Sequence, residues 1–228
     1  MSSSNEENMV VALDIGTSKV VAIVGSVGPG GELEIVGTGM HASSGLKKGV
    51  VVNIEATVNS IQRAIEEAEL MAGCSIHSVY AGIAGSHIRS LNSHGIVAIR
   101  DREVQPLDLE RVIDAARAVA IPADQEILHV LPQEFIIDDQ EGVREPIGMS
   151  GVRLEATVQV VSCAANAAQD IKKCIRRCGL EVDDLALEQL ASSYAVLTED
   201  GKQLGVALVD IGGGTSDIAV YHDGAVIH

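Results

Sequence analysis

Positive charge is scarce in this chain of 228 residues. It has 16 Lys and Arg against 32 Asp and Glu, which gives a formal net charge of −16. A nucleic-acid backbone binds where Lys and Arg are concentrated, and an anionic membrane surface attracts polybasic segments. The composition therefore argues against a nucleic-acid partner and against a polybasic membrane anchor.

Long hydrophobic runs are also missing. No window offers the roughly 18 consecutive apolar residues expected of a membrane-spanning helix. The segment Ser2–Asn8 is polar and acidic, which differs from the basic start of a signal peptide and predicts a disordered tail over residues 1–8. With 46% hydrophobic residues, the chain has the composition of a globular protein. We expect a soluble cytoplasmic chain.

Cysteine is sparse and shows no Cys-x-x-Cys pair; the four are Cys74, Cys163, Cys174 and Cys178. Cys174 and Cys178 are four residues apart on an expected helix and could share a metal ion. They fall on the apolar face of that helix with Ile171 and Ile175, however, which favours buried thiols.

Two segments almost 200 residues apart carry nearly the same pattern. Val11–Ser18 and Ala207–Thr215 are apolar runs that end in Asp-Ile-Gly followed by small hydroxyl or glycine residues. Each continues into a second apolar run, at 20–24 and 218–221. The pattern predicts two β-hairpins with near-identical turns, and its duplication indicates a phosphate clamp that holds a nucleotide from both sides.

The residue types in these turns suit a magnesium-bound phosphate chain. Glycines let backbone N–H groups approach an anion, hydroxyls add donors, and aspartate can hold a hydrated Mg²⁺. Asp14 and Asp210 are the candidate Mg²⁺ partners, and Lys19 could reach the β-phosphate. Asp217 either joins the Mg²⁺ shell or caps its hairpin. The candidate cradle consists of Gly16, Thr17, Ser18, Gly212, Gly213, Gly214 and Thr215.

Periodicity predicts an alternating β and α pattern. A helix over 54–72 starts at the cap Asn53 and stops at Gly73. Further helices are expected over 108–120, 167–178 and 185–197. Strands are expected over 9–13, 20–24, 33–37, 78–83, 86–91, 95–99, 127–131, 134–138 and 153–162, and in the second hairpin over 205–209 and 218–221.

These motifs resemble those of the actin, heat-shock-70 and sugar-kinase superfamily, whose two phosphate motifs look like 13–24 and 208–221. Three further segments, Gly45–Asn53, Gly82–Ile88 and Gly142–Met149, resemble the FtsA family of bacterial cell-division proteins. The resemblance implies an α/β, actin-like (ribonuclease H-like) nucleotide-binding fold. Its expected parts are subdomain 1A over 9–83 and 162–204, an inserted subdomain 1C over 84–161, and the first hairpin of subdomain 2A over 205–228.

What the resemblance implies for function is an ATP- and Mg²⁺-binding division protein. It would self-associate into filaments, tether the FtsZ ring to the membrane, and recruit later division proteins through 1C. Its expected place is the cytoplasmic face of the inner membrane at the division septum. The alternative is an active ATPase or phosphotransferase of the heat-shock-70 or sugar-kinase branch.

Hydrolysis would need a residue that orients the attacking water, and the candidate is Glu188. Heat-shock proteins have a Glu-Pro pair where this chain has Glu188-Gln189, so the carboxylate is kept and the proline is not. A salt bridge on the helix surface explains Glu188 equally well. We therefore expect ATP binding with slow or negligible turnover.

The sequence stops at His228, seven residues after the second hairpin. The superfamily's adenosine motif and second connecting helix would lie further on, as would the amphipathic C-terminal helix with which FtsA-like proteins bind the membrane. We expect this chain to be the N-terminal part of a longer protein, with a truncated second lobe and membrane contact only through that missing helix.

Overall fold

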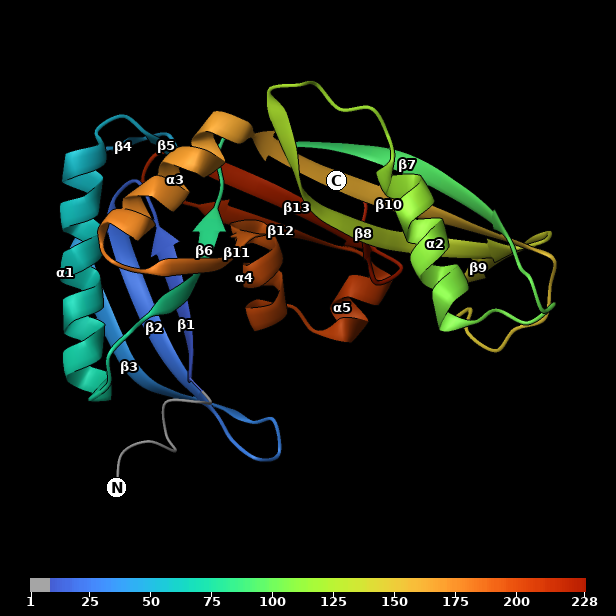
Figure 1. Cartoon of the computed structure of the whole chain (residues 1–228), viewed down its shortest axis with the longest axis horizontal. Helices are drawn as coiled ribbons and strands as arrows, with labels where there is room; N and C mark the ends of the chain where they lie inside the picture. The colour runs from blue at the N-terminus through green and yellow to red at the C-terminus, as the bar shows by residue number, and fades with distance from the viewer. Residues whose placement is uncertain (1–8) are drawn as a thin grey trace. The chain divides into compact units, whose positions relative to one another are not determined.

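A computed structural model describes residues 9–228, so the predicted tail over 1–8 lies outside the described residues. The chain forms two compact units. The first contains the described residues up to His87 together with Ala165–Ser193 and Val209–Asp217. The second contains Ile88–Ala164, Tyr194–Leu208 and Ile218–His228. Each unit is built on a sheet with helical cover (Figure 1).

The first unit has a five-stranded sheet in the order β11-β6-β1-β2-β3. Strands β1, β2 and β3 form an antiparallel meander, whereas β1, β6 and β11 run parallel. A short hairpin of β4 (Leu46–Lys47) and β5 (Val50–Val51) follows β3. The strands of the sheet are β1 (Met9–Ile15), β2 (Lys19–Val27), β3 (Leu33–Ala42), β6 (Ser78–Ile83) and β11 (Glu181–Leu187).

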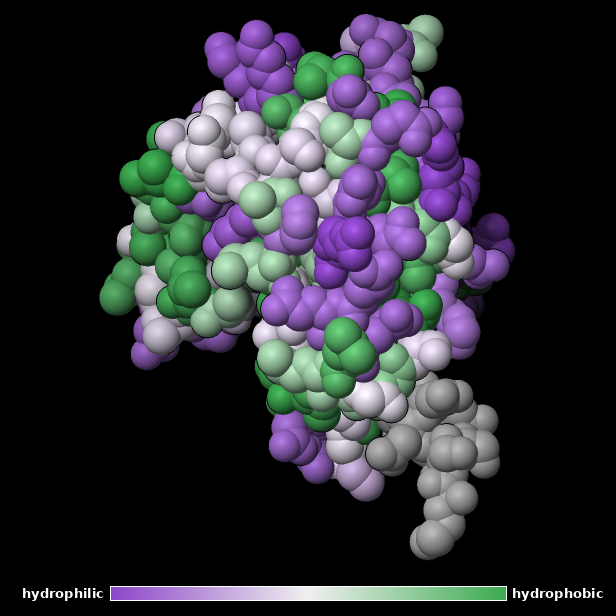
Figure 2. Space-filling model, turned by 90° about the vertical axis from the view of Figure 1, so that its left-hand side faces the viewer, coloured by the Kyte–Doolittle hydropathy of each residue, from purple (hydrophilic) through white to green (hydrophobic). Residues whose placement is uncertain are grey.

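Helix α1 (Ile54–Ala72) has the predicted bounds and caps. The Asn53 side chain accepts a hydrogen bond from the Ala56 N–H at 3.0 Å, and Gly73 ends the helix with a φ of 67°. Helix α3 (Ala165–Arg177) starts two residues before its predicted range and ends one residue earlier. Side chains of both helices and the sheet form the core, among them Leu13, Val20, Val24, Ile61, Ala64, Val79, Ile83, Ile171 and Ile175. Figure 2 shows this end of the molecule, where hydrophilic surface alternates with hydrophobic patches.

Helix α1 lies very close to strand β3. A Cβ added to Gly39 would lie 1.9 Å from the Ala64 carbonyl oxygen, and one added to Gly37 would lie 2.8 Å from the Ala68 carbonyl oxygen. Real Cβ atoms do not approach backbone oxygens to such distances, so both positions require glycine. These two glycines therefore allow α1 to pack directly on the backbone of β3, in the sheet whose strands β1 and β2 form the first glycine hairpin.

The second unit has a four-stranded sheet in the order β7-β10-β8-β9, with helix α2 (Pro106–Arg117) packed against it. The buried side chains between α2 and the sheet include Val104, Val112, Ala116, Phe135, Leu154, Val158 and Val160. The strands are β7 (Arg89–Ala98), β8 (Gln125–Ile137), β9 (Gln140–Val143) and β10 (Arg153–Ala164).

Two predicted breaks in this unit were wrong. The predicted strands 86–91 and 95–99 were separated by 92–94, but residues 89–98 form the single strand β7, because residues 92–94 pair with residues 157–159 of β10. The predicted strands 127–131 and 134–138 likewise join in β8, which ends at Ile137; Pro132 pairs with Val158, beside a register shift between Thr157 and Val158. A bulge tolerates proline inside a sheet because one ladder hydrogen bond is already lost there.

Two helix predictions also needed correction. Helix α2 begins at Pro106 rather than Asp108, because the Asp108 carboxylate accepts the Gln105 N–H at 3.2 Å and acts as a residue of the first turn. The predicted helix 185–197 is wrong in its first three residues, which belong to β11. Strand β11 has a register shift between Val182 and Asp184, which breaks its alternation and hides it in the sequence.

Helix α4 (Glu188–Val196) follows β11 directly, and the short helix α5 (Glu199–Leu204) comes next. The second glycine hairpin consists of β12 (Val206–Ile211) and β13 (Ser216–His222), extended by β14 (Ala225–Val226). Over residues 9–228, none of the helices combines the length and apolar character needed to cross a membrane.

Candidate functional site

The two glycine turns have the same backbone geometry. The Gly16 N–H donates to the Lys19 carbonyl at 3.0 Å, and the Gly212 N–H donates to the Thr215 carbonyl at 2.9 Å. In each case the glycine follows the Asp-Ile pair at the end of a strand, β1 or β12. The prediction of two hairpins with near-identical turns is confirmed.

The turns also face each other, and both belong to the first unit. A Cβ added to Gly213 would lie 2.7 Å from the Ser18 Cβ, and one added to Gly214 would lie 2.8 Å from the Thr17 Cγ2. Glycine therefore permits an approach that any other residue would block. The structure brings the two predicted cradles together.

Four carboxylates gather beside these turns. Burial, together with the charges of Asp14, Asp210 and Asp217, raises the pKa of Glu188 to about 8. Loss of water also raises the pKa of Asp14, while Lys19 lowers it and Asp210 raises it. Glu188 thus lies among like charges, and a bound cation would relieve that repulsion.

Glu188 is the first residue of α4 and lies against strand β6. A Cβ on Gly82 would come within 2.8 Å of the Glu188 Cγ, so the strand leaves room for this side chain only because residue 82 is glycine. The predicted salt bridge on the helix surface is not what holds Glu188, since its carboxyl is largely buried among acids.

The space enclosed at the turns is small, about 30 Å³. That is roughly the volume of one water molecule. It is lined by residues of both turns and their neighbours: Ile15, Gly16, Thr17, Gly49, Gly82, Ile83, Ala84, Ile171, Glu188 and Thr215. A triphosphate chain is larger than this space, so we expect the turns to lie further apart when one is bound.

The donor set fits magnesium held through water. Across residues 9–228, no three His, Cys, Asp or Glu side chains are arranged to ligate a metal ion directly. Magnesium usually keeps several waters and takes only one or two carboxylates beside phosphate oxygens. Asp14 and Asp210 can play that part from opposite turns, and their assignment stays a prediction.

Two residues of the site were missed in the sequence. The Gly49 N–H donates to the Thr17 Oγ1 at 3.3 Å, and Gly82 accommodates Glu188. Gly49 and Gly82 lie in two of the segments that resemble the FtsA family, Gly45–Asn53 and Gly82–Ile88. Nothing in the sequence, however, indicates that they contact the two turns. Their role follows only from the folded chain.

The cysteines behave as ordinary thiols. Cys174 is buried and Cys178 is partly buried. The Cys178 Sγ donates to the carbonyls of Cys174 and Val58 at 3.4 and 3.5 Å. Burial raises the pKa of each of these thiols to about 11, which disfavours the thiolate that a metal would need.

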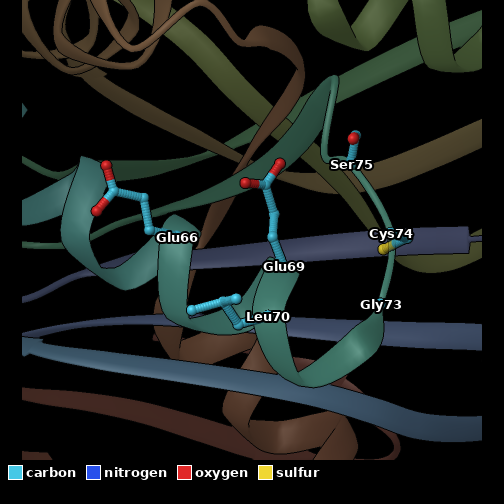
Figure 3. A pocket seen from close by; sticks show the side chains of 6 residues that line it. All are labelled: Glu66, Glu69, Leu70, Gly73, Cys74 and Ser75. Atoms are coloured by element: carbon cyan, nitrogen blue, oxygen red, sulfur yellow. The ribbon is translucent and has the colours of Figure 1, made fainter.

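A larger hollow, of about 590 Å³, lies at the end of α1 and is not a phosphate site (Figure 3). Glu66, Glu69, Leu70, Gly73, Cys74 and Ser75 line it. The Glu69 carboxylate already accepts the Ile76 N–H at 2.7 Å, and the lining includes no cation. Two carboxylates would repel a phosphate there.

Glu188→Gln should stabilise the protein at high pH and have little effect at low pH. The folded-state pKa of about 8 lies above the usual 4.5, so ionisation of Glu188 costs stability as pH rises from about 4.5 to 8. In thermal unfolding with EDTA, the variant should have a higher Tm than the unmodified protein at pH 8.5 and the same Tm at pH 4. Glu34→Gln, on the exposed side of β3, is the control. Equal Tm values at pH 8.5 would contradict the buried position of Glu188.

The fold defines the class of protein: it is the fold of the actin-like ATPases. Two solved structures share it at low sequence identity. A PilM–PilN complex of type IV pilus biogenesis aligns with a TM-score of 0.65 and 16% identity, over 96% of this chain and 60% of that one. The ethanolamine utilization protein EutJ from Carboxydothermus hydrogenoformans aligns with a TM-score of 0.52 and 16% identity, over 96% and 50%.

Sequence comparison gives the particular family. Residues 85–162 match the family described as the SHS2 domain inserted in FTSA. The cell division protein FtsA of Pseudomonas aeruginosa is 72% identical over all 228 residues, which cover 55% of its length. FtsA of Escherichia coli K12 is 49% identical over 228 residues, covering 54%. The chain belongs to the FtsA family, and it spans about half the length of the curated relatives it matches.

Proposed function

We propose that this chain binds Mg-ATP between its two glycine turns as part of a cell-division protein. The observation that carries the proposal is the pair of equivalent turns beside a cluster of carboxylates. The two turns face each other so closely that an added Cβ on Gly213 or Gly214 would clash with the opposite turn. Facing backbone N–H groups suit phosphate oxygens, and the carboxylates suit a hydrated divalent cation. An actin-like fold and relatives named as cell division proteins support it.

In this proposal each turn supplies one half of the phosphate site. Gly16, Thr17 and Ser18 contact the phosphates from one side, with Lys19 as a cation. The second turn contacts them from the other side, through Gly212, Gly213, Gly214 and Thr215. Asp14 and Asp210 hold Mg²⁺ through waters, and Asp217 either joins that shell or caps its hairpin.

Hydrolysis is slow in this proposal. Glu188 is the residue placed to orient water, but its raised pKa keeps the carboxyl mostly protonated at neutral pH. A protonated carboxyl cannot accept a proton from the attacking water. We therefore propose that the chain acts through nucleotide binding rather than through rapid turnover.

The cellular role follows from the family. We propose that the whole protein self-associates into filaments, tethers the FtsZ ring to the cytoplasmic face of the inner membrane at the septum, and recruits later division proteins. Residues 84–161 would form subdomain 1C and make the recruiting contacts; the match of 85–162 to the SHS2 domain supports this division. Residues 9–83 and 162–204 would form subdomain 1A, and 205–228 would begin subdomain 2A.

Asp210→Ala tests the clamp. In the full natural protein that contains this sequence, the loss of one Mg²⁺ partner should weaken Mg-ATP binding by about 1 to 3 kcal/mol. Titration with a fluorescent ATP analogue in Mg²⁺ measures it. Asp183→Ala, which removes an exposed carboxylate of β11, should leave affinity unchanged. Unchanged affinity in Asp210→Ala would make Asp210 an ordinary turn residue.

A further inference from the structure

A short lysine hairpin is fastened to the first glycine turn. It consists of β4 and β5, and it is closed at its base by Gly45, whose carbonyl accepts the N–H groups of Val52 and Asn53 at 2.7 and 3.1 Å. The nearby Ser43 N–H donates to the Ser18 carbonyl at 3.0 Å. The hairpin is therefore held both to the start of α1 and to the turn Gly16–Ser18.

Gly49 makes the contact that matters for chemistry. Its N–H donates to the Thr17 Oγ1 at 3.3 Å, and Gly49 also lines the small cavity at the turns. Because that hydroxyl oxygen already accepts a hydrogen bond, its own O–H is left to donate to a neighbouring acceptor. A phosphate oxygen between the turns would be such an acceptor.

Lys48 and Gly49 are the two loop residues of this hairpin, with φ of 53° and 77°. Positive φ at both positions is the geometry of a type I′ turn, which suits the twist of a two-residue hairpin. A Cβ on Gly49 would lie 2.6 Å from the Ala84 carbonyl oxygen, so this position also requires glycine where the hairpin meets Ala84.

Charge also favours a role for this hairpin at the site. Three acids, Asp14, Asp210 and Asp217, act on Glu188, whereas Lys19 is the cation that acts on Asp14. A triphosphate adds further negative charge, so Mg²⁺ and Lys19 alone balance it poorly. Lys47 and Lys48 are both exposed at the tip of the hairpin, in a chain with few cations. Lys48 is the neighbour of Gly49, and its stem is long and flexible.

We propose that the hairpin Leu46–Val51 is a third wall of the phosphate site. Gly49 acts as a positioning residue that aims the Thr17 hydroxyl, and Lys48 binds the terminal phosphates of a nucleoside triphosphate. The inference rests on the proposed function, because it needs a triphosphate between the two turns. The added contact is the one between Lys48 and the terminal phosphates, which neither glycine turn provides.

The test compares neighbouring lysines in the full natural protein. Lys48→Gln should weaken Mg-ATP binding roughly tenfold, which corresponds to about 1.4 kcal/mol, and should weaken Mg-ADP binding less. Lys47→Gln removes the same charge from the same hairpin and should change neither affinity more than twofold. Lys48→Arg should restore most of the Mg-ATP affinity. Calorimetric titration measures all of them, and thermal unfolding without nucleotide checks that each variant is folded.

The outcomes separate this inference from the function on which it rests. If the unmodified protein binds no Mg-ATP, the proposed function fails. If it binds Mg-ATP and Lys48→Gln binds equally well, the clamp stands and the third wall is wrong. The inference would also be overturned if Lys47→Gln and Lys48→Gln lost equal affinity, or if Lys48→Gln lost equal affinity for Mg-ATP and Mg-ADP. The lower positive charge of the hairpin would then explain the losses without a direct contact.

Discussion

Gly213→Val is expected to weaken Mg-ATP binding by about 3 kcal/mol, roughly 100-fold. A Cβ at this position would lie 2.7 Å from the Ser18 Cβ and 2.9 Å from the Ser18 Oγ, so a valine side chain would fill the space between the two turns in which the phosphates are proposed to lie. A valine side chain would also block backbone N–H groups from a phosphate. Calorimetric titration of the full natural protein with Mg-ATP measures the loss.

The matched control for this variant is Ile211→Ala. Ile211 is two residues earlier in the same hairpin and 79% exposed, so its truncation should leave the affinity within twofold. If Gly213→Val binds Mg-ATP as tightly as the unmodified protein, the phosphates do not bind in the space between the two turns.

Gly39→Val should lower the free energy of unfolding of the first unit by about 3 kcal/mol or more. The added Cβ would lie 1.9 Å from the Ala64 carbonyl oxygen and 2.6 Å from the Ala68 backbone nitrogen. Both atoms belong to the backbone of α1, so no side chain can turn away to make room. Urea unfolding followed by circular dichroism measures the change.

Ala42→Val adds a larger side chain at an exposed position of the same strand and should change stability by less than about 0.5 kcal/mol. Similar stability in Gly39→Val and the unmodified protein would mean that α1 does not lie on β3 as described. If both variants lost the same free energy of unfolding, the cause would be the valine in strand β3 itself and not the contact with α1.

The turns and α1 could be predicted because their signals are local. An apolar run, Asp-Ile-Gly and a second apolar run lie within about a dozen residues, and the caps of α1 lie next to the helix they end. Local backbone rules are sufficient for such elements. The duplication of the turns then predicted that they act together, and the structure brings them face to face.

The missed elements depend on distant partners. Residues 92–94 were predicted as a break between two strands, but they pair with β10 within the single strand β7. Residues 185–187 have a helix-like pattern, but they pair with β6 across a register shift. Neither fact can be derived from a window of neighbouring residues, because each depends on which element packs against the segment.

The sequence named candidate residues for the site but gave no information on their electrostatics. Asp14, Glu188 and Asp210 were all named as candidates. That their carboxyl groups interact, and that burial raises the pKa of Glu188 to about 8, follows only from the way β1, α4 and the second hairpin meet. Gly49 could not be found at all without the hydrogen bond to Thr17.

The most direct test of the clamp is a crystal structure of the full natural protein with Mg²⁺ and a slowly hydrolysed ATP analogue. The account predicts that the β- and γ-phosphates lie between Gly16–Lys19 and Gly212–Thr215, with Mg²⁺ linked through waters to Asp14 and Asp210. It also predicts that the two turns lie further apart than they do here. A nucleotide bound elsewhere, or bound while Gly213 still lies against Ser18, would contradict the account.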